Sequence, residues 1–240
     1  MDLETTGLSP ASDLIIEIGG VFWDTDRETA IEAGGFLVRL PEGVALDPRI
    51  TKLTGITPAD LEEWGGDLPD TLLRIGAMCQ KHGVSYLVGH NGRAFDRAFL
   101  RAAVARLAAS RPEIDHLLTL PWLDTMEDLP FPEEMKTRKL SHLAAEHGFL
   151  NPFPHRALFD VMTSLRLLSC YPLEEVIRRA AAPIVTVVAL VPFDRKQEAK
   201  DAGFFWDAPS KFWTKRIRDF EEADLALLPF PTRVVSREAP

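Results

Sequence analysis

The stretch Asp2-Leu3-Glu4-Thr5-Thr6-Gly7 places two carboxylates two residues apart at the start of the chain. If Asp2 to Glu4 ends a strand, both side chains point to the same face of a sheet, so their oxygens can reach one cation. Gly7 lets the backbone turn tightly and lets a substrate approach closely. Two nearby acids alone are more typical of a solvated surface. A metal site therefore needs further ligands from elsewhere in the chain.

Two later segments supply such ligands. His90-Asn91-Gly92-Arg93-Ala94-Phe95-Asp96 follows a short apolar run and opens a helical pattern, and His155-Arg156-Ala157-Leu158-Phe159-Asp160 opens another. The three motifs, DLETTG, HNGRAFD and HRALFD, resemble in this order those of the DEDDh family of 3′–5′ exonucleases, which includes proofreading subunits of DNA polymerases. The resemblance spans about residues 1–171.

The resemblance implies a metal-dependent nuclease. Its catalytic residues would be Asp2, Glu4, Asp96, His155 and Asp160. The four carboxylates would hold two Mg²⁺ or Mn²⁺ ions, because hard oxygen ligands suit these cations better than zinc. Such an ion pair activates water and stabilises an in-line displacement at phosphorus. His155 is the expected general base, because imidazole titrates near neutral pH. The expected reaction releases 5′-mononucleotides from a 3′ end, with DNA favoured.

Substrate contacts are expected from Thr5, Thr6, Asn91 and Phe95. For Asn91, stabilisation of a turn is an equal alternative, and the helical spacing of Phe95 and Phe99 also predicts that both face the core. Glu17 lies inside an apolar run, where we expect an outward-facing strand residue rather than a fifth site carboxylate. Two competing functions stay open: an exoribonuclease that trims RNA, and a non-catalytic nucleic-acid-binding module.

The fold class implied by the resemblance is α/β: a ribonuclease H-like mixed sheet, with its first three strands antiparallel, flanked by helices. The order of apolar segments agrees with this fold. We expect strands at 14–18, 21–23, 36–38, 84–88 and 117–123. We expect helices that begin at Thr57-Pro58, at 96 and at about 155, a helix that covers 72–78 and ends at Gly83, and a helix from 140 to 148.

Composition limits the setting of the protein. The net charge of −9 disfavours binding a polyanion, and cations bound by the clustered carboxylates would offset it locally. Cys79 and Cys170 are expected to be buried thiols in a reducing compartment. Since there is no secretory pattern or membrane-length apolar run, the expected location is cytoplasmic, without membrane contact. Only Met1 precedes the opening motif, so we expect further native residues upstream.

Pro183 predicts a boundary between an exonuclease domain at 1–182 and a small α+β module at 183–240. A strand is expected at 184–191, a helix at 194–202 and a hairpin at 204–214. The spacing Lys196, Ala199-Lys200, Gly203, Trp206-Asp207, Lys211, Trp213 resembles a small module of poorly defined role that is attached to DNA-processing proteins. The expected partners of the whole chain are single-stranded or frayed nucleic acid 3′ ends, which the exonuclease resemblance implies, and a DNA-replication or repair protein. The tryptophans are expected to form the core of this module in preference to stacking on bases.

Overall fold

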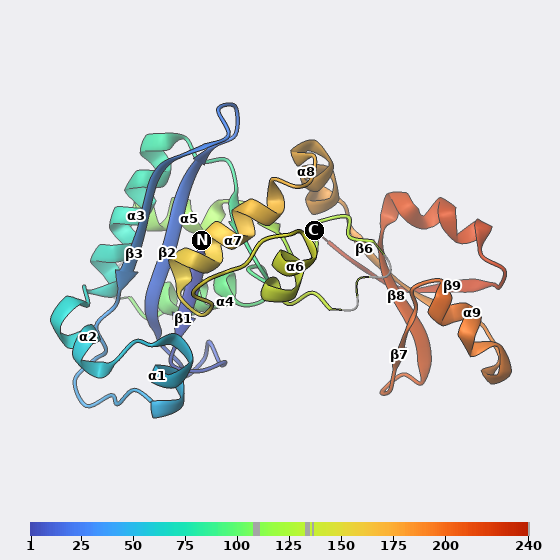
Figure 1. Cartoon of the computed structure of the whole chain (residues 1–240), viewed down its shortest axis with the longest axis horizontal. Helices are drawn as coiled ribbons and strands as arrows, with labels where there is room; N and C mark the ends of the chain where they lie inside the picture. Colours follow the sequence, from blue (N-terminus) through green and yellow to red (C-terminus); the bar gives the residue numbers. More distant parts are fainter. Residues whose placement is uncertain (108–110, 133–134, 136, 240) are drawn as a thin grey trace. The chain divides into compact units, whose positions relative to one another are not determined.

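The computed structural model describes residues 1–107, 111–132, 135 and 137–239. They fall into two compact units (Figure 1). The first combines Met1–Asp128 with Arg138–Tyr171, and the second combines Leu129–Thr137 with Pro172–Pro240. The boundary at 182/183 stays a prediction. None of the helices in the described part of the chain is both long and apolar enough to cross a membrane.

The first unit is built on the antiparallel strands β1 (Asp2–Thr5), β2 (Ile15–Asp24) and β3 (Thr29–Leu37), in that spatial order. Their register places Glu4 directly opposite Glu17. Strands β4 (Leu87–Gly89) and β5 (Trp122–Asp124) form a parallel pair. The Met1 nitrogen donates to the Val88 carbonyl at 2.6 Å, so the start of β1 lies against β4. The predicted α/β class with three antiparallel leading strands is confirmed.

Seven helices of the described residues belong to this unit: α1 (Pro48–Thr54), α2 (Pro58–Trp64), α3 (Leu68–His82), α4 (Asp96–Ala105), α5 (Pro112–Thr119), α6 (Leu140–Glu146) and α7 (Ala157–Leu168). Thr57 accepts a hydrogen bond from the Asp60 N–H and so caps α2 as predicted. Gly83 ends α3 with a φ of 60°, a left-handed conformation that glycine adopts without steric cost.

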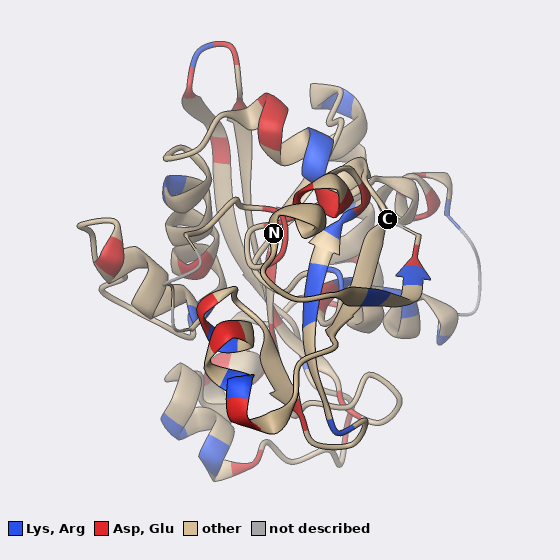
Figure 2. Cartoon of the chain, turned by 90° about the vertical axis from the view of Figure 1, so that its right-hand side faces the viewer, with Lys and Arg blue, Asp and Glu red and all other residues tan. Residues whose placement is uncertain are grey.

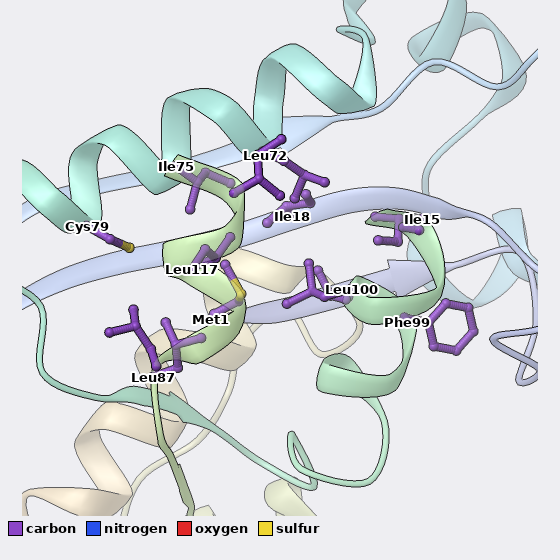
Figure 3. Close-up of a cluster of buried hydrophobic side chains, with 14 of the residues drawn as sticks. Met1, Ile15, Ile18, Leu72, Ile75, Cys79, Leu87, Phe99, Leu100 and Leu117 are labelled. Carbon is purple, nitrogen blue, oxygen red and sulfur yellow. The ribbon is translucent and has the colours of Figure 1, made fainter. Parts of the chain in front are cut away.

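Helices cover the sheet on opposite faces. Helix α7 packs across β1 and β2, whereas α3, α4 and α5 enclose the main hydrophobic core. Figure 3 shows Leu72, Ile75 and Cys79 of α3 pointing into the same buried cluster as Ile18 of β2. Burying such side chains stabilises the fold by about 1.5–3 kcal/mol each. The core fixes the position of β1, and thereby of the two carboxylates on it.

Two sequence predictions about this unit are wrong, and one helix was missed. Residues 117–119 lie in helix α5 instead of a strand, because Pro112 starts a helix whose apolar residues Ile114 and Leu117 recur at helical spacing. Helix α1, capped by Asp47, was not predicted. Cys170 is exposed because it follows the last turn of α7, whereas Cys79 is buried as expected.

The second unit contains helices α8 (Leu173–Ala181) and α9 (Lys196–Asp201), the 3₁₀ segments η1 (Phe193–Arg195) and η2 (Asp219–Leu227), and the strands β6 (Ile184–Ala189), β7 (Phe205–Asp207), β8 (Phe212–Arg218) and β9 (Thr232–Glu238). The strands form one antiparallel sheet in the order β7-β8-β6-β9. Its core is formed by Val185, Val187, Ala189, Ala199, Phe204, Ile217 and Phe230. The prediction that the tryptophans form this core is wrong for Trp206, which is 51% exposed, whereas Trp213 is half-buried and packs against the core.

Candidate active site

Two carboxylates project from β1. Burial and the neighbouring carboxylates of Asp96, Asp160 and Glu4 raise the pKa of Asp2 well above its usual range. Burial, followed by the charges of Asp160 and Glu17, raises the pKa of Glu4 to about 8. These shifts arise because several like charges share a site with little water. The site therefore favours either protons or a bound cation.

Asp96 reaches the same site from the first turn of α4. Its carboxylate is buried, and its Oδ1 atom has no hydrogen-bond partner in the described part of the chain. Burial raises the pKa of Asp96 to about 7. An unpartnered buried carboxylate oxygen is costly unless a proton or a cation is bound to it.

A second set of acids holds the loop before α4. The Asp124 carboxylate accepts backbone N–H groups of Asn91 at 2.8 Å and Arg93 at 3.1 Å. The Arg93 guanidinium donates to Asp128 at 2.9 Å, and Asp128 also accepts the Asp124 N–H at 2.7 Å. This buried network fixes the turn from which Asp96 projects. Neither Asp124 nor Asp128 is among the candidate residues taken from the sequence.

Asp160 lies in the first turn of α7, where it holds the loop before the helix. Its Oδ2 accepts the His155 backbone N–H at 2.9 Å, and its Oδ1 accepts the Asn151 side-chain amide. His155 has a φ of 63° and lies two residues before the helix, which allows its ring to approach the site. Ligand atoms of Glu4, His155 and Asp160 all lie within 4.8 Å of one another. Sequence reasoning missed Asn151, which precedes a Pro-rich segment and gave no signal.

Glu17 is buried rather than outward-facing, so this sequence prediction is wrong. Its carboxylate is 3% exposed and accepts the Arg156 Nη2 at 3.0 Å and the Ala157 backbone N–H at 2.9 Å. Strand β2 and the start of α7 are in close contact here, because a Cβ at Gly19 would overlap the Ala157 carbonyl carbon. Glu17 does not face solvent because α7 covers this face of the sheet. Its buried charge is balanced by the opposite charge of Arg156.

The expected substrate-contacting residues lie around this cluster. The Thr5 hydroxyl donates to the Gly7 carbonyl at 2.6 Å, and the Thr6 hydroxyl accepts the Leu14 N–H at 2.9 Å. Asn91 adopts a φ of 64° in the turn that Asp124 holds. The Phe95 ring packs on Phe99 with centroids 4.7 Å apart. Both threonine hydroxyls thus serve the local turn, and substrate contact by these four residues stays a prediction.

The donor set fits a divalent cation. Carboxylate oxygens are the ligands that hard cations prefer, and the Asp96 Oδ1 is a buried acceptor without a partner among the described residues. Glu4 and Asp160 approach each other closely enough for joint coordination. A cation would replace the protons that the raised pKa values favour, because opposite charge stabilises the ionised carboxylates.

This sheet with its carboxylate cluster defines a nuclease of ribonuclease H-like architecture. The chain belongs to the exonuclease family, whose model matches residues 1–168, and its DEDDh motifs classify it as a 3′–5′ exonuclease hydrolase. Members of this group depend on divalent metal ions. Residues 185–235 match a domain of unknown function (DUF8626).

Among curated relatives, the PolC-type DNA polymerase III of Bacillus subtilis (strain 168) is 32% identical over 174 residues, which cover 70% of this chain and 11% of the polymerase. The chain thus spans about a tenth of that protein's length. Escherichia coli exonuclease I in complex with a dT13 oligonucleotide aligns with a TM-score of 0.57 and 19% identity, covering 78% of this chain and 47% of the other. The nuclease domain of 3′hExo, a DEDDh family member bound to rAMP, aligns with a TM-score of 0.56 and 20% identity, covering 69% and 86%.

Proposed function

We propose that the first unit removes 5′-mononucleotides from the 3′ ends of single-stranded or frayed nucleic acid, with DNA as the favoured substrate. The observation that carries the proposal is the convergence of Glu4, His155 and Asp160 within 4.8 Å, together with the buried Asp96, whose Oδ1 has no hydrogen-bond partner among the described residues. A purely binding module needs no imidazole beside its carboxylates. The cluster therefore favours hydrolysis over the non-catalytic alternative.

Asp2, Glu4, Asp96 and Asp160 would hold two Mg²⁺ or Mn²⁺ ions. When bound, such ions lower the pKa of water and stabilise the charge that develops on the phosphate. Asp2 and Glu4 are held in place by β1, and Asp96 by the Asp124 network. The protein therefore presents its oxygens before the substrate arrives.

His155 is the proposed general base. Its backbone N–H is bound to Asp160, so the chain places the imidazole beside Glu4 and Asp160. A neutral imidazole there can accept a proton from the attacking water. Its exposed position leaves a path by which the proton returns to solvent. The left-handed backbone of His155 is the local conformation that permits this approach.

The preference for DNA is proposed from the relatives, which include a DNA polymerase and an exonuclease solved with a DNA oligonucleotide. The neighbour bound to rAMP keeps an exoribonuclease as the second candidate. A replication or repair partner is proposed because one of the relatives is a DNA polymerase. A cytoplasmic location is proposed because both cysteines are free thiols.

The experiment compares matched single-stranded DNA and RNA, each labelled at its 5′ end, with Mg²⁺, Mn²⁺ or EDTA. We expect stepwise shortening of the DNA with either metal ion and an intact strand with EDTA. Faster shortening of RNA would select the exoribonuclease. Endonucleolytic fragments, or intact strands of both kinds with both metal ions, would contradict the proposal.

A further inference from the structure

The spacing motif of the second unit plays no part in the proposed hydrolysis, and its residues divide into two groups. Ala199 is buried in the core, and Gly203 follows α9 with a φ of 76° that suits glycine. Asp207 accepts the Ser210 N–H at 3.1 Å and holds the turn between β7 and β8. These three residues shape the fold. The remaining motif residues are lysines and tryptophans: Lys196, Lys200, Trp206, Lys211 and Trp213.

The two tryptophans lie opposite each other on β7 and β8. Their ring centroids are 5.6 Å apart with an interplanar angle of 59°. Trp206 is 51% exposed, and Phe193 nearby in the sequence is 79% exposed. Neither Trp206 nor Phe193 belongs to the hydrophobic core of the unit. Exposed aromatic rings on a small folded unit are typical of a recognition surface.

Lysines accompany these rings. The Lys200 ammonium lies 5.6 Å from the Trp213 ring centroid, and the Lys196 ammonium lies 4.1 Å from that of Phe193. The two lysines are four residues apart on α9, so they share one side of the helix. Among the described residues neither lysine forms an ion pair, so both charges are available to a ligand.

Acidic side chains of the same helix are already engaged. Glu198 pairs with Arg195 at 2.6 Å, and Asp201 accepts the Gln197 amide at 2.6 Å. Acidic and basic residues are interspersed over the second unit, as Figure 2 shows by colour, and residues 183–240 contain nine of each. Although the net charge of these residues is zero, the acidic side chains of α9 are paired locally. Lys196 and Lys200 therefore remain as the positive groups beside the aromatic rings.

We propose that Phe193, Lys196, Lys200, Trp206 and Trp213, here called the aromatic–lysine surface, bind single-stranded nucleic acid. The rings stack on bases, and the ammonium groups contact phosphates. This combination binds without sequence preference, because every base has a π face and every nucleotide a phosphate. The inference goes beyond the proposed function, since all of these residues lie in the second unit.

The test uses the whole 240-residue chain in EDTA, so that binding is measured without cleavage. Fluorescence anisotropy follows a labelled long single strand over a series of salt concentrations. Trp206→Ala should weaken binding about tenfold, as expected for the loss of one base-stacking ring. Lys200→Gln should lower the slope of log K against log salt by about 0.7, as expected for one phosphate contact. Trp206→Phe should restore most of the affinity.

A matched control is Phe220→Ala. Phe220 is also exposed, at 38%, and the Arg178 guanidinium lies 4.2 Å from its ring centroid. Phe220 lies in η2, outside the motif. Its loss should leave affinity and salt slope unchanged. Unchanged affinity and slope in folded Trp206→Ala and Lys200→Gln would overturn the inference. Binding in EDTA without any metal-dependent shortening would instead contradict the proposed function and leave this inference standing.

Discussion

Burial makes ionisation of Glu4 and Asp96 unfavourable in the metal-free protein, with pKa values of about 8 and about 7. Each carboxyl therefore binds its proton more tightly in the folded chain than in the unfolded chain. Stability from these protons is complete below the ordinary carboxyl values of about 4 and is lost as pH rises through the folded values. A bound cation reverses the preference, because it stabilises the ionised form.

We therefore expect the melting temperature in EDTA to fall between about pH 5 and about pH 9, and Mg²⁺ or Mn²⁺ to raise it most at the alkaline end. Thermal unfolding followed by circular dichroism measures both effects. Glu4→Gln is the control, because its side chain does not titrate and should show a shallower fall. A fall as steep in Glu4→Gln as in the natural sequence would contradict this assignment.

The roles of Asp160 and His155 predict different losses of activity. Asp160→Ala removes a proposed cation ligand and the acceptor of the His155 N–H, so it should abolish strand shortening. His155→Ala should leave a trace of activity that recovers as pH rises, because hydroxide partly replaces a general base. Rates on a 5′-labelled strand across pH measure this difference. Equal residual rates with the same pH profile would show that the proposed roles are wrong.

Two of the three segments that carry the proposed catalytic residues depend on an acid that lies outside the predicted catalytic set. Asp124 holds the turn before α4, and Glu17 on β2 holds the first residues of α7 through Arg156 and the Ala157 N–H. Gly19 has no side chain and so allows β2 to contact the start of α7 directly. The helix start is therefore held both by Glu17 and by this contact at Gly19. The spacing between Asp160 and Glu4 thus depends on how these elements pack.

Glu17→Gln should weaken this attachment. The amide keeps the size of the side chain but loses the charge that Arg156 pairs with, so we expect a loss of about 1–3 kcal/mol in unfolding free energy. Because α7 carries Asp160, we also expect kcat to fall more than KM rises. Steady-state kinetics and denaturant unfolding measure the two effects. Glu63→Gln, an exposed acid on α2, is the control, and matching behaviour of both variants would contradict the role of Glu17.

At the scale of the whole molecule, the two compact units have separate hydrophobic cores. The proposed cation ligands all lie in the first unit, and the aromatic–lysine surface lies in the second. A ligand stabilises the folded part that binds it by mass action. The two proposed functions are therefore separable by experiment.

We expect calorimetry to resolve two unfolding transitions, with Mg²⁺ or Mn²⁺ raising only the one that belongs to the first unit. The metal-dependent rise should be absent in Asp160→Ala. A long single strand added in EDTA should raise the other transition, and this rise should be reduced in Trp206→Ala. One cooperative transition that responds equally to both ligands would contradict the separation.

The sequence by itself determined the residue types and the order of the catalytic motifs, together with most element positions. The Thr57-Pro58 start, the Gly83 end and the first-turn place of Asp96 are local signals, so they were predictable. Tertiary structure alone decided the burial of Glu17, the hydrogen bond from Asn151 to Asp160 and the exposure of Trp206. These depend on which element packs against the residue: the partners of Glu17 lie 139 and 140 residues further along the chain, and Asn151 reaches Asp160 across an irregular loop. Local spacing carries no information about such contacts, which appear only when the sheet and helices assemble.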